Sequence, residues 1–418
     1  MLGGSAGALR TAAAGVAVFV ALAVMLLTLR LVRGRIAAVA AGVLFSTVGS
    51  SPFLESFTLS GELLAALPAV LSLLAFVGYL RRPRGSAGLP WLVAGGLLTG
   101  CAFMVRQSAV DAGVAAVAHL LWRERRRALV PVGILVAAAA LPVAIGALTA
   151  ASFHDWWFAV VGYRGHDSLL TGSASEHLRL FWQSAPAALK GLGLLGLLAA
   201  IGWGGSPLLV RLWLGAAALG VLGGGSFHAH YYLQLVPPLS VLGGLGVRRL
   251  MEQRLVVARA AAAAVSIATV AVTAPLWFDG PEAQARAIWP HDRHLLHDGA
   301  VARYVQAHTR PSDRIYVVWA AANLYYLADR DPSFRYLWRR NVEKIPSALA
   351  DVRRMLERQR PVLVIAAQKP SVVDHSGRTD EILRRRYRLV ARIEGVPVYR
   401  RRSNPRNTSA VTSNSSAP

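Results

Sequence analysis

Two glutamates separate two apolar runs near the start of the chain. Glu55 and Glu62 belong to the segment SSPFLESFTLSGE, residues 50–62. Carboxylates at the mouth of a helix bundle can accept a proton, bind sugar hydroxyls or hold a divalent metal ion, the one cofactor that this pair suggests. We therefore expect Glu55 and Glu62 to be catalytic candidates. The structural alternative is that Glu62, two residues after Ser60, occupies a first helical turn, where the helix dipole favours an acid.

Arg106 is the second candidate, in the segment FMVRQS between two short apolar runs. The guanidinium fork suits phosphate recognition, so we expect Arg106 to bind substrate. Asp111, five residues later, could pair with it. The alternative is an interfacial arginine that snorkels to the headgroups.

A third polar cluster opens a later apolar run, in SFHAHYYLQLVPP at residues 226–238. Its substrate-binding candidates are His228, His230, Tyr231, Tyr232 and Gln234. An aromatic belt with interfacial histidines is the alternative. A metal site would need one or two more ligands than this segment offers, so we assign no metal ligands.

The composition shows what kind of chain must position these residues. Of the 418 residues 54% are apolar and 16% are charged, with 45 Lys+Arg against 22 Asp+Glu and a formal net charge of +23. This composition excludes a single soluble core and a mostly disordered chain. The single cysteine, Cys101, excludes a disulfide framework. Ten apolar runs between residues 11 and 277 predict an α-helical polytopic membrane protein with about ten transmembrane helices.

The arginines give the orientation of this membrane domain, residues 1–277. They concentrate in alternate loops, which we expect to be cytoplasmic: 30–35, 81–84, 123–127, 211 and 248–254. We expect the membrane to be the plasma or inner membrane. The opposite loops then lie on its outer side, including a long one at about 152–186. Everything after residue 277 lies on the same outer side. Because the charge marks topology and contacts membrane lipids, we expect no nucleic-acid partner.

The rest of the chain predicts a small extracytoplasmic α/β domain over residues 278–402, followed by a disordered tail, 403–418. We expect helices at 295–309, 320–328, 345–359 and 379–386, and strands at 314–319, 361–366, 387–393 and 396–401. Strands alternating with helices favour parallel βαβ packing.

Several segments resemble the GT-C glycosyltransferases, in the branch of protein O-mannosyltransferases and aminoarabinose transferases. In that superfamily, an outer loop with an acidic residue connects two helices. A similar arrangement is found here in LFSTVGSSPFLESFTLSGELLAALPAVLSLLAFVGYLRR. The superfamily's glycine-rich helix, which ends in a basic residue, resembles GLLTGCAFMVRQSA, where Arg106 matches that residue. The bacterial members carry an H-Y-Y-x-Q-x-x-P segment, which resembles FHAHYYLQLVPP and matches it from His230 to Pro237. The resemblance implies that Arg106 contacts a lipid phosphate.

The resemblance also implies a function. We expect transfer of a sugar from a polyprenyl-phosphate donor to an envelope glycan, lipid or protein on the outer face. Members of the superfamily carry an acidic motif in a first outer loop, whereas MLGGSAGALR precedes the first run here and Glu55 is the first acid. We therefore expect a chain that lacks one helix and that loop, with impaired catalysis. A lipid-linked-sugar transporter or flippase and a non-catalytic envelope scaffold are the alternatives.

Overall fold

The chain forms two compact units, Met1–Gly280 and Pro281–Pro418. The computed structural model describes residues 6–56, 58–82, 87–162, 173–253, 256–280, 283, 286, 294–319 and 322–402. The tail expected at 403–418 lies outside these residues. Each unit has its own apolar core.

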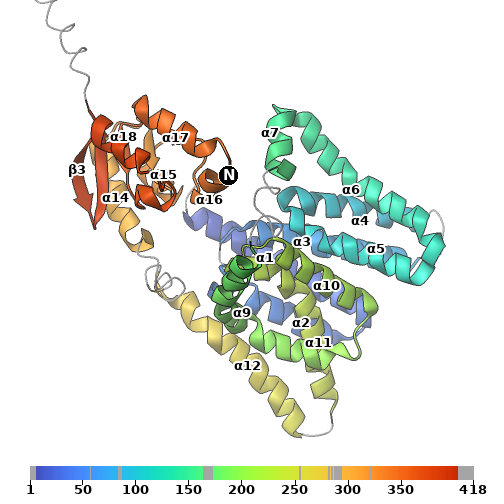
Figure 1. Cartoon of the computed structure of the whole chain (residues 1–418). Helices are drawn as coiled ribbons and strands as arrows, with labels where there is room; N and C mark the ends of the chain where they lie inside the picture. The colour runs from blue at the N-terminus through green and yellow to red at the C-terminus, as the bar shows by residue number, and fades with distance from the viewer. Residues whose placement is uncertain are drawn as a thin grey trace, which may run out of the picture. The chain divides into compact units, whose positions relative to one another are not determined.

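The first unit is helical, coloured from blue to yellow in Figure 1. Its α-helices are α1 Ala6–Val32, α2 Arg35–Val48, α3 Gly61–Leu80, α4 Leu89–Val105, α5 Asp111–Glu124, α6 Leu129–Thr149, α7 Phe153–Trp157, α9 Ala174–Trp203, α10 Leu208–Gly223, α11 Val236–Glu252 and α12 Val256–Phe278. Short 3₁₀ turns join them at η1 Pro52–Leu54, η2 Gln107–Val110, η3 Arg125–Ala128 and η5 Ala229–Leu235, and η4 Phe158–Gly162 is a π-helical turn. A helix therefore forms at each of the ten apolar runs.

Among the residues that the structure describes, four segments are long and apolar enough to cross a membrane: Ala8–Val32, Gly61–Leu80, Gln107–Thr149 and Ala174–Trp203. Four shorter apolar helices accompany them. Large apolar side chains point outward from this unit, among them Leu148, which is 86% exposed, and Leu189, which is 73% exposed. An apolar outer surface of this kind suits contact with lipid. The number of crossings stays a prediction.

The loop expected at about 152–186 is shorter than the sequence indicated, because α9 begins at Ala174. Ser173 caps it, with its hydroxyl accepting a hydrogen bond from the Glu176 amide at 3.1 Å. The first turns of α9 are polar and contain Pro186, so the apolar pattern becomes visible only later in the helix.

Small residues let the central helices approach closely. A Cβ added at Gly202 of α9 or at Gly246 of α11 would collide with backbone of the facing helix, and one at Gly244 would meet the backbone of α2. Glycine is favoured at such crossings because membrane helices associate through backbone-level packing. Ser72 of α3 adds a polar contact to α4, donating to the carbonyl of Gly95 at 2.8 Å. The segment that leads into α11 is therefore fixed to a tightly packed core.

The second unit is a small α/β fold. It comprises α14 His294–His308, β1 Ile315–Val317, α15 Ala322–Ala328, α16 Arg339–Lys344, α17 Ala348–Glu357, β2 Leu363–Ile365, η6 Pro370–Val372, α18 Arg378–Arg386, β3 Tyr387–Ile393 and β4 Val396–Arg401. The sheet order is β1-β2-β4-β3. Ile315 aligns with Leu363 in the parallel pair, and Leu363 aligns with Arg400 in an antiparallel one. All four strands occur where the sequence predicts strands.

Parallel packing was the wrong expectation for the last two strands. β3 and β4 form an antiparallel hairpin, with Ile393 opposite Val396. The two residues between them, Glu394 and Gly395, both have positive φ, at 49° and 82°. Two such residues build the tight turn whose twist matches a hairpin, so no crossover can follow β3. The short helix α16 was not predicted from the sequence.

Candidate active site

The start of α3 positions the first glutamate of the site. Ser60 caps the helix, since its hydroxyl accepts a hydrogen bond from the Leu63 amide at 3.3 Å. Glu62 therefore lies in the first turn, as the capping alternative proposed, and its side chain is only 2% exposed. Burial of a carboxylate requires a partner, and the guanidinium of Arg106 supplies one through an ion pair. Glu62 thus combines a favourable place in the helix dipole with a charge contact to α4.

Arg106 stands where α4 ends. Its backbone is extended, at φ −155° and ψ 125°, so the chain breaks before η2 and turns the guanidinium toward α3. Besides the Glu62 contact, Nε donates to the Ser108 hydroxyl at 2.7 Å, and Cζ lies 4.0 Å from the ring centroid of Tyr231. The side chain is 12% exposed. A carboxylate, a hydroxyl and an aromatic ring therefore fix the plane of the guanidinium.

Asp111 has a partner other than the arginine suggested by the sequence. Its Oδ2 accepts a hydrogen bond from Trp213 Nε1 at 2.9 Å, which joins α5 to α10. Its other oxygen, Oδ1, is buried and has no hydrogen-bond partner among the described residues.

Glu55 ends η1 and contacts the later cluster directly. It has a left-handed backbone, φ 54° and ψ 23°, and its Oε2 lies 2.5 Å from His230 Nδ1. His230 Nε2 lies 3.9 Å from Glu62 Oε1, so the imidazole stands between the two glutamates. The exposed fraction is 20% for the side chain of Glu55 and 28% for His230. Glu55 and His230 are therefore reachable from solvent, whereas Glu62 is not.

The segment η5 distributes its side chains to different neighbours. The His228 and His230 rings stack with centroids 5.5 Å apart, and Tyr231 meets His230 edge-on at 4.9 Å. Tyr232 turns toward α9, where its hydroxyl lies 2.7 Å from Ser184 Oγ. Gln234 Nε2 donates to the Ser108 carbonyl at 2.7 Å, which braces the turn that carries Arg106. Of the five predicted residues, His228, His230 and Tyr231 therefore lie beside the glutamates. Tyr232 and Gln234 instead hold η5 against its neighbours.

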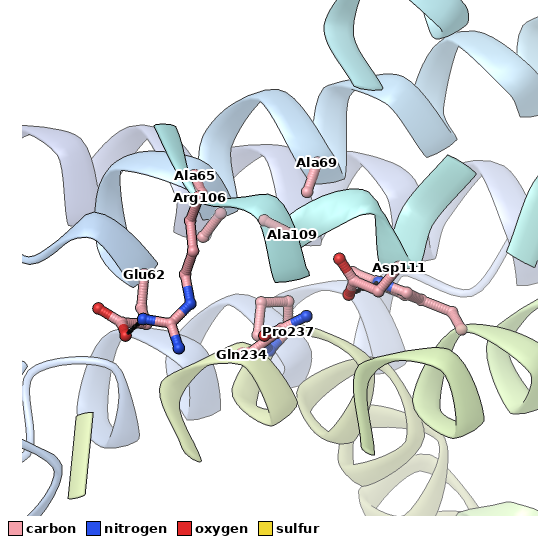
Figure 2. A pocket seen from close by; sticks show the side chains of 10 residues that line it. Glu62, Ala65, Ala69, Arg106, Ala109, Asp111, Gln234 and Pro237 are labelled. Atoms are coloured by element: carbon pink, nitrogen blue, oxygen red, sulfur yellow. Dashed lines mark hydrogen bonds and ion pairs between the residues drawn. The ribbon is translucent and has the colours of Figure 1, made fainter. Parts of the chain in front are cut away.

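A small cavity of about 20 Å³ borders Glu62 and Arg106 (Figure 2), with room for about one water molecule. Glu62 and Arg106 lie at one side of it and Asp111 at the other, with Gln234 and Pro237 from the η5–α11 junction between them.

Sequence reasoning missed Ser108 and Trp213. The position of Ser108, two residues after an arginine in a helix break, is a signal that could have found it, whereas Trp213 resembles any other core residue of an apolar helix.

No group of three His, Cys, Asp or Glu side chains comes together at metal-binding spacing in the described part of the chain. Glu55 and Glu62 contact His230 and Arg106 instead. The described residues therefore do not fit a metal site with three protein ligands.

Comparison with known proteins identifies the fold. No family model matches the sequence, and no curated protein is significantly similar to it. Among solved structures, the chain is similar to ArnT from Cupriavidus metallidurans bound to undecaprenyl phosphate, with 15% identity and a TM-score of 0.57 over 94% of this chain and 83% of ArnT. The chain has the GT-C fold. The apo structure of the same ArnT gives a TM-score of 0.59 at 14% identity, over 93% of this chain and 83% of ArnT. The GT-C fold was the expectation from the sequence resemblance, and it is confirmed.

Proposed function

We propose that this chain is a membrane glycosyltransferase that moves a sugar from a polyprenyl-phosphate donor to a cell-envelope acceptor on the outer face of the membrane. The observation that carries the proposal is the cluster of Glu55, His230, Glu62 and Arg106, which joins a solvent-reachable acid–base pair to a guanidinium. The fold also supports the proposal, because a solved structure of ArnT, which has the same fold, contains undecaprenyl phosphate.

The proposed reaction is a direct displacement at the anomeric carbon. An acceptor hydroxyl oxygen bonds to that carbon, the bond from carbon to phosphate oxygen breaks, and polyprenyl phosphate leaves with the bond electrons. Glu55 takes the hydroxyl proton, because its carboxylate is reachable while that of Glu62 is buried. His230 orients Glu55 through the 2.5 Å contact.

Arg106 is the residue that we propose for the donor phosphate. The contacts from Glu62, Ser108 and Tyr231 hold its guanidinium in one plane, and a preorganised fork is suited to phosphate oxygens. His228 borders the same cluster through its stack with His230. Gln234 and Tyr232 act one step back, as the residues that position η5.

The test is transfer of radiolabelled sugar from a polyprenyl-phosphate donor in membranes that contain the wild-type chain or Glu55→Gln. We expect product with the wild type and at least a 100-fold lower rate with Glu55→Gln. Glu252→Gln is the matched control, since Glu252 is 57% exposed and pairs only with Arg248 among the described residues. Equal rates for the two variants would contradict the role of Glu55.

The same assay separates the alternatives. A transporter would change the side of the membrane on which the donor is accessible and form no glycosidic bond, whereas a scaffold would do neither. Because the proposed step uses no metal ion, we expect transfer to continue in the presence of EDTA.

A further inference from the structure

A basic pocket lies in the second unit, beside α17. Its volume is about 370 Å³. One wall is α17 with its C-cap, where Asp351, Arg354 and Met355 of the helix and the C-cap Arg358 follow one another at helical spacing and so share one face. The remaining lining residues are Arg360, just after the helix, and the segment Ser333, Phe334 and Arg335. We call this surface the basic pocket.

The charge of the basic pocket is strongly unbalanced. Four arginines and one aspartate line it. Asp351 already contacts two of them, Arg354 at 3.1 Å and Arg335 at 4.0 Å. Arg358 and Arg360 have no acidic partner within 4 Å among the described residues. The pocket therefore has an excess of guanidinium groups, which bind carboxylate and phosphate through paired hydrogen bonds.

The floor of the basic pocket adds two further features. Phe334 and Met355 are buried, at 9% and 4% exposed, and provide apolar surface beneath the arginines. The hydroxyl oxygen of Ser333 is buried and has no hydrogen-bond partner among the described residues. A buried hydroxyl without a partner is costly, so a ligand is favoured if its entry displaces the atoms that cover this oxygen and completes the hydrogen bond.

We propose that the basic pocket binds an anionic sugar unit, one that carries a phosphate or a carboxylate, such as occurs in acidic envelope glycans. The arginines would hold the anionic group, the Ser333 hydroxyl would bond a sugar hydroxyl, and the apolar floor would take the C–H face of the ring. The volume falls within the range of small-molecule sites, about 300–1,000 Å³, and offers more room than a phosphate alone requires. If the proposed function holds, this site makes acidic glycans the acceptor class, and that last step alone rests on the proposed function.

Binding to the purified full-length protein tests the proposal. The protein is kept in a polyoxyethylene detergent, which carries no sugar, and titrated by calorimetry with glucose 6-phosphate, glucuronate, glucose, glycerol 3-phosphate and inorganic phosphate. Arg354→Gln/Arg358→Gln removes two charges from the basic pocket. Arg378→Gln/Arg388→Gln removes the same charge from two exposed positions outside it. Ser333→Ala removes only the unpaired hydroxyl, and circular dichroism checks that each variant keeps its fold.

We expect saturable binding of glucose 6-phosphate and glucuronate but not of glucose. Binding should weaken at least tenfold in Arg354→Gln/Arg358→Gln, several-fold in Ser333→Ala, and not at all in Arg378→Gln/Arg388→Gln. No saturable binding by the wild type, or equal weakening in both double variants, would overturn the site. Binding of inorganic phosphate as tight as that of glucose 6-phosphate would overturn the sugar, and tighter binding of glycerol 3-phosphate would point instead to a lipid headgroup. None of these measurements depends on sugar transfer, so this proposal and the proposed function fail separately.

Discussion

His230 Nδ1 lies 2.5 Å from Glu55 Oε2, although 175 residues separate the two in the chain. The contact joins the loop before α3 to the turn before α11, so each segment contributes half of the acid–base pair. Both side chains are partly exposed, which distinguishes them from the buried Glu62.

The Glu55–His230 pair should behave as one unit in kinetics. We expect Glu55→Gln and His230→Gln each to lower kcat/KM for sugar transfer by about 100-fold. The double variant should have a kcat/KM no lower than that of the less active single variant, because loss of either partner disables the pair. Steady-state kinetics on the four proteins checks this. His154→Gln, at an exposed position on α7, is the control. Multiplication of the two single effects in the double variant would mean that the residues act independently.

The Glu62–Arg106 pair should separate stability from activity. Arg106→Ala leaves the Glu62 carboxylate buried without its cation, which we expect to lower the free energy of unfolding by about 3 kcal/mol. The double variant Glu62→Gln/Arg106→Gln has no buried charge there, so we expect it to regain most of that stability while donor turnover stays low. Thermal unfolding in detergent and the transfer assay give the two readouts. Unaltered donor turnover in Arg106→Ala would rule out the phosphate role.

Asp374 should make the second unit sensitive to acid. Burial alone would raise the pKa of Asp374, but hydrogen bonds from Arg353, Ser376 and Thr379 outweigh it and hold that pKa well below its usual range. A depressed folded-state pKa contributes stability that is complete above the ordinary pKa of an aspartate, about 4, and is lost as the pH falls below it. We expect Asp374→Asn to lower the melting temperature at pH 7, and the difference from wild type to shrink between pH 5 and pH 3. A difference that stays constant over this range would show that the carboxylate charge contributes nothing.

Cysteine labelling tests the orientation predicted from the arginine-rich loops. Cys101 is the only cysteine, so Cys101→Ser provides a background without thiols. We expect Arg388→Cys in β3 to react with a membrane-impermeant maleimide in intact spheroplasts, and Arg126→Cys in η3 to react only after permeabilisation. Both positions are exposed in the structure, so accessibility within the fold does not distinguish them. The opposite labelling pattern would show that the orientation is the reverse of the predicted one.

Much of the fold could be read from the sequence because its signals are local. Each apolar run predicts a helix without knowledge of its neighbours. The start of α9 was missed because Ser173 caps a polar first segment that precedes the apolar part. The β3–β4 hairpin was missed although its signal, Glu394-Gly395, is local and could have been recognised.

The residues of the candidate site were found because polar groups stand out among apolar runs, whereas their pairing was not. Arg106 contacts Glu62, 44 residues away, and Gln234 contacts Ser108, 126 residues away. Asp111 is nearer to Arg106 in sequence, yet Trp213 on α10 is its partner. Helix packing decides these contacts, and the sequence pattern carries no distance information between helices.

Different helices hold the two sides of the site. η5 continues directly into α11, which begins with Pro237-Pro238 in its first turn and packs through Gly244 and Gly246 against backbone of α2 and α9. Because η5 leads directly into α11, His230 is held in place by the tightly packed helices α2, α9 and α11. Glu55 stands on a short 3₁₀ turn outside any long helix. Leu54, next to Glu55, is fully buried and packs against Gly191 of α9. Both halves of the acid–base pair are therefore anchored on helices that pack against each other, and the contact between α9 and α11 sets their separation.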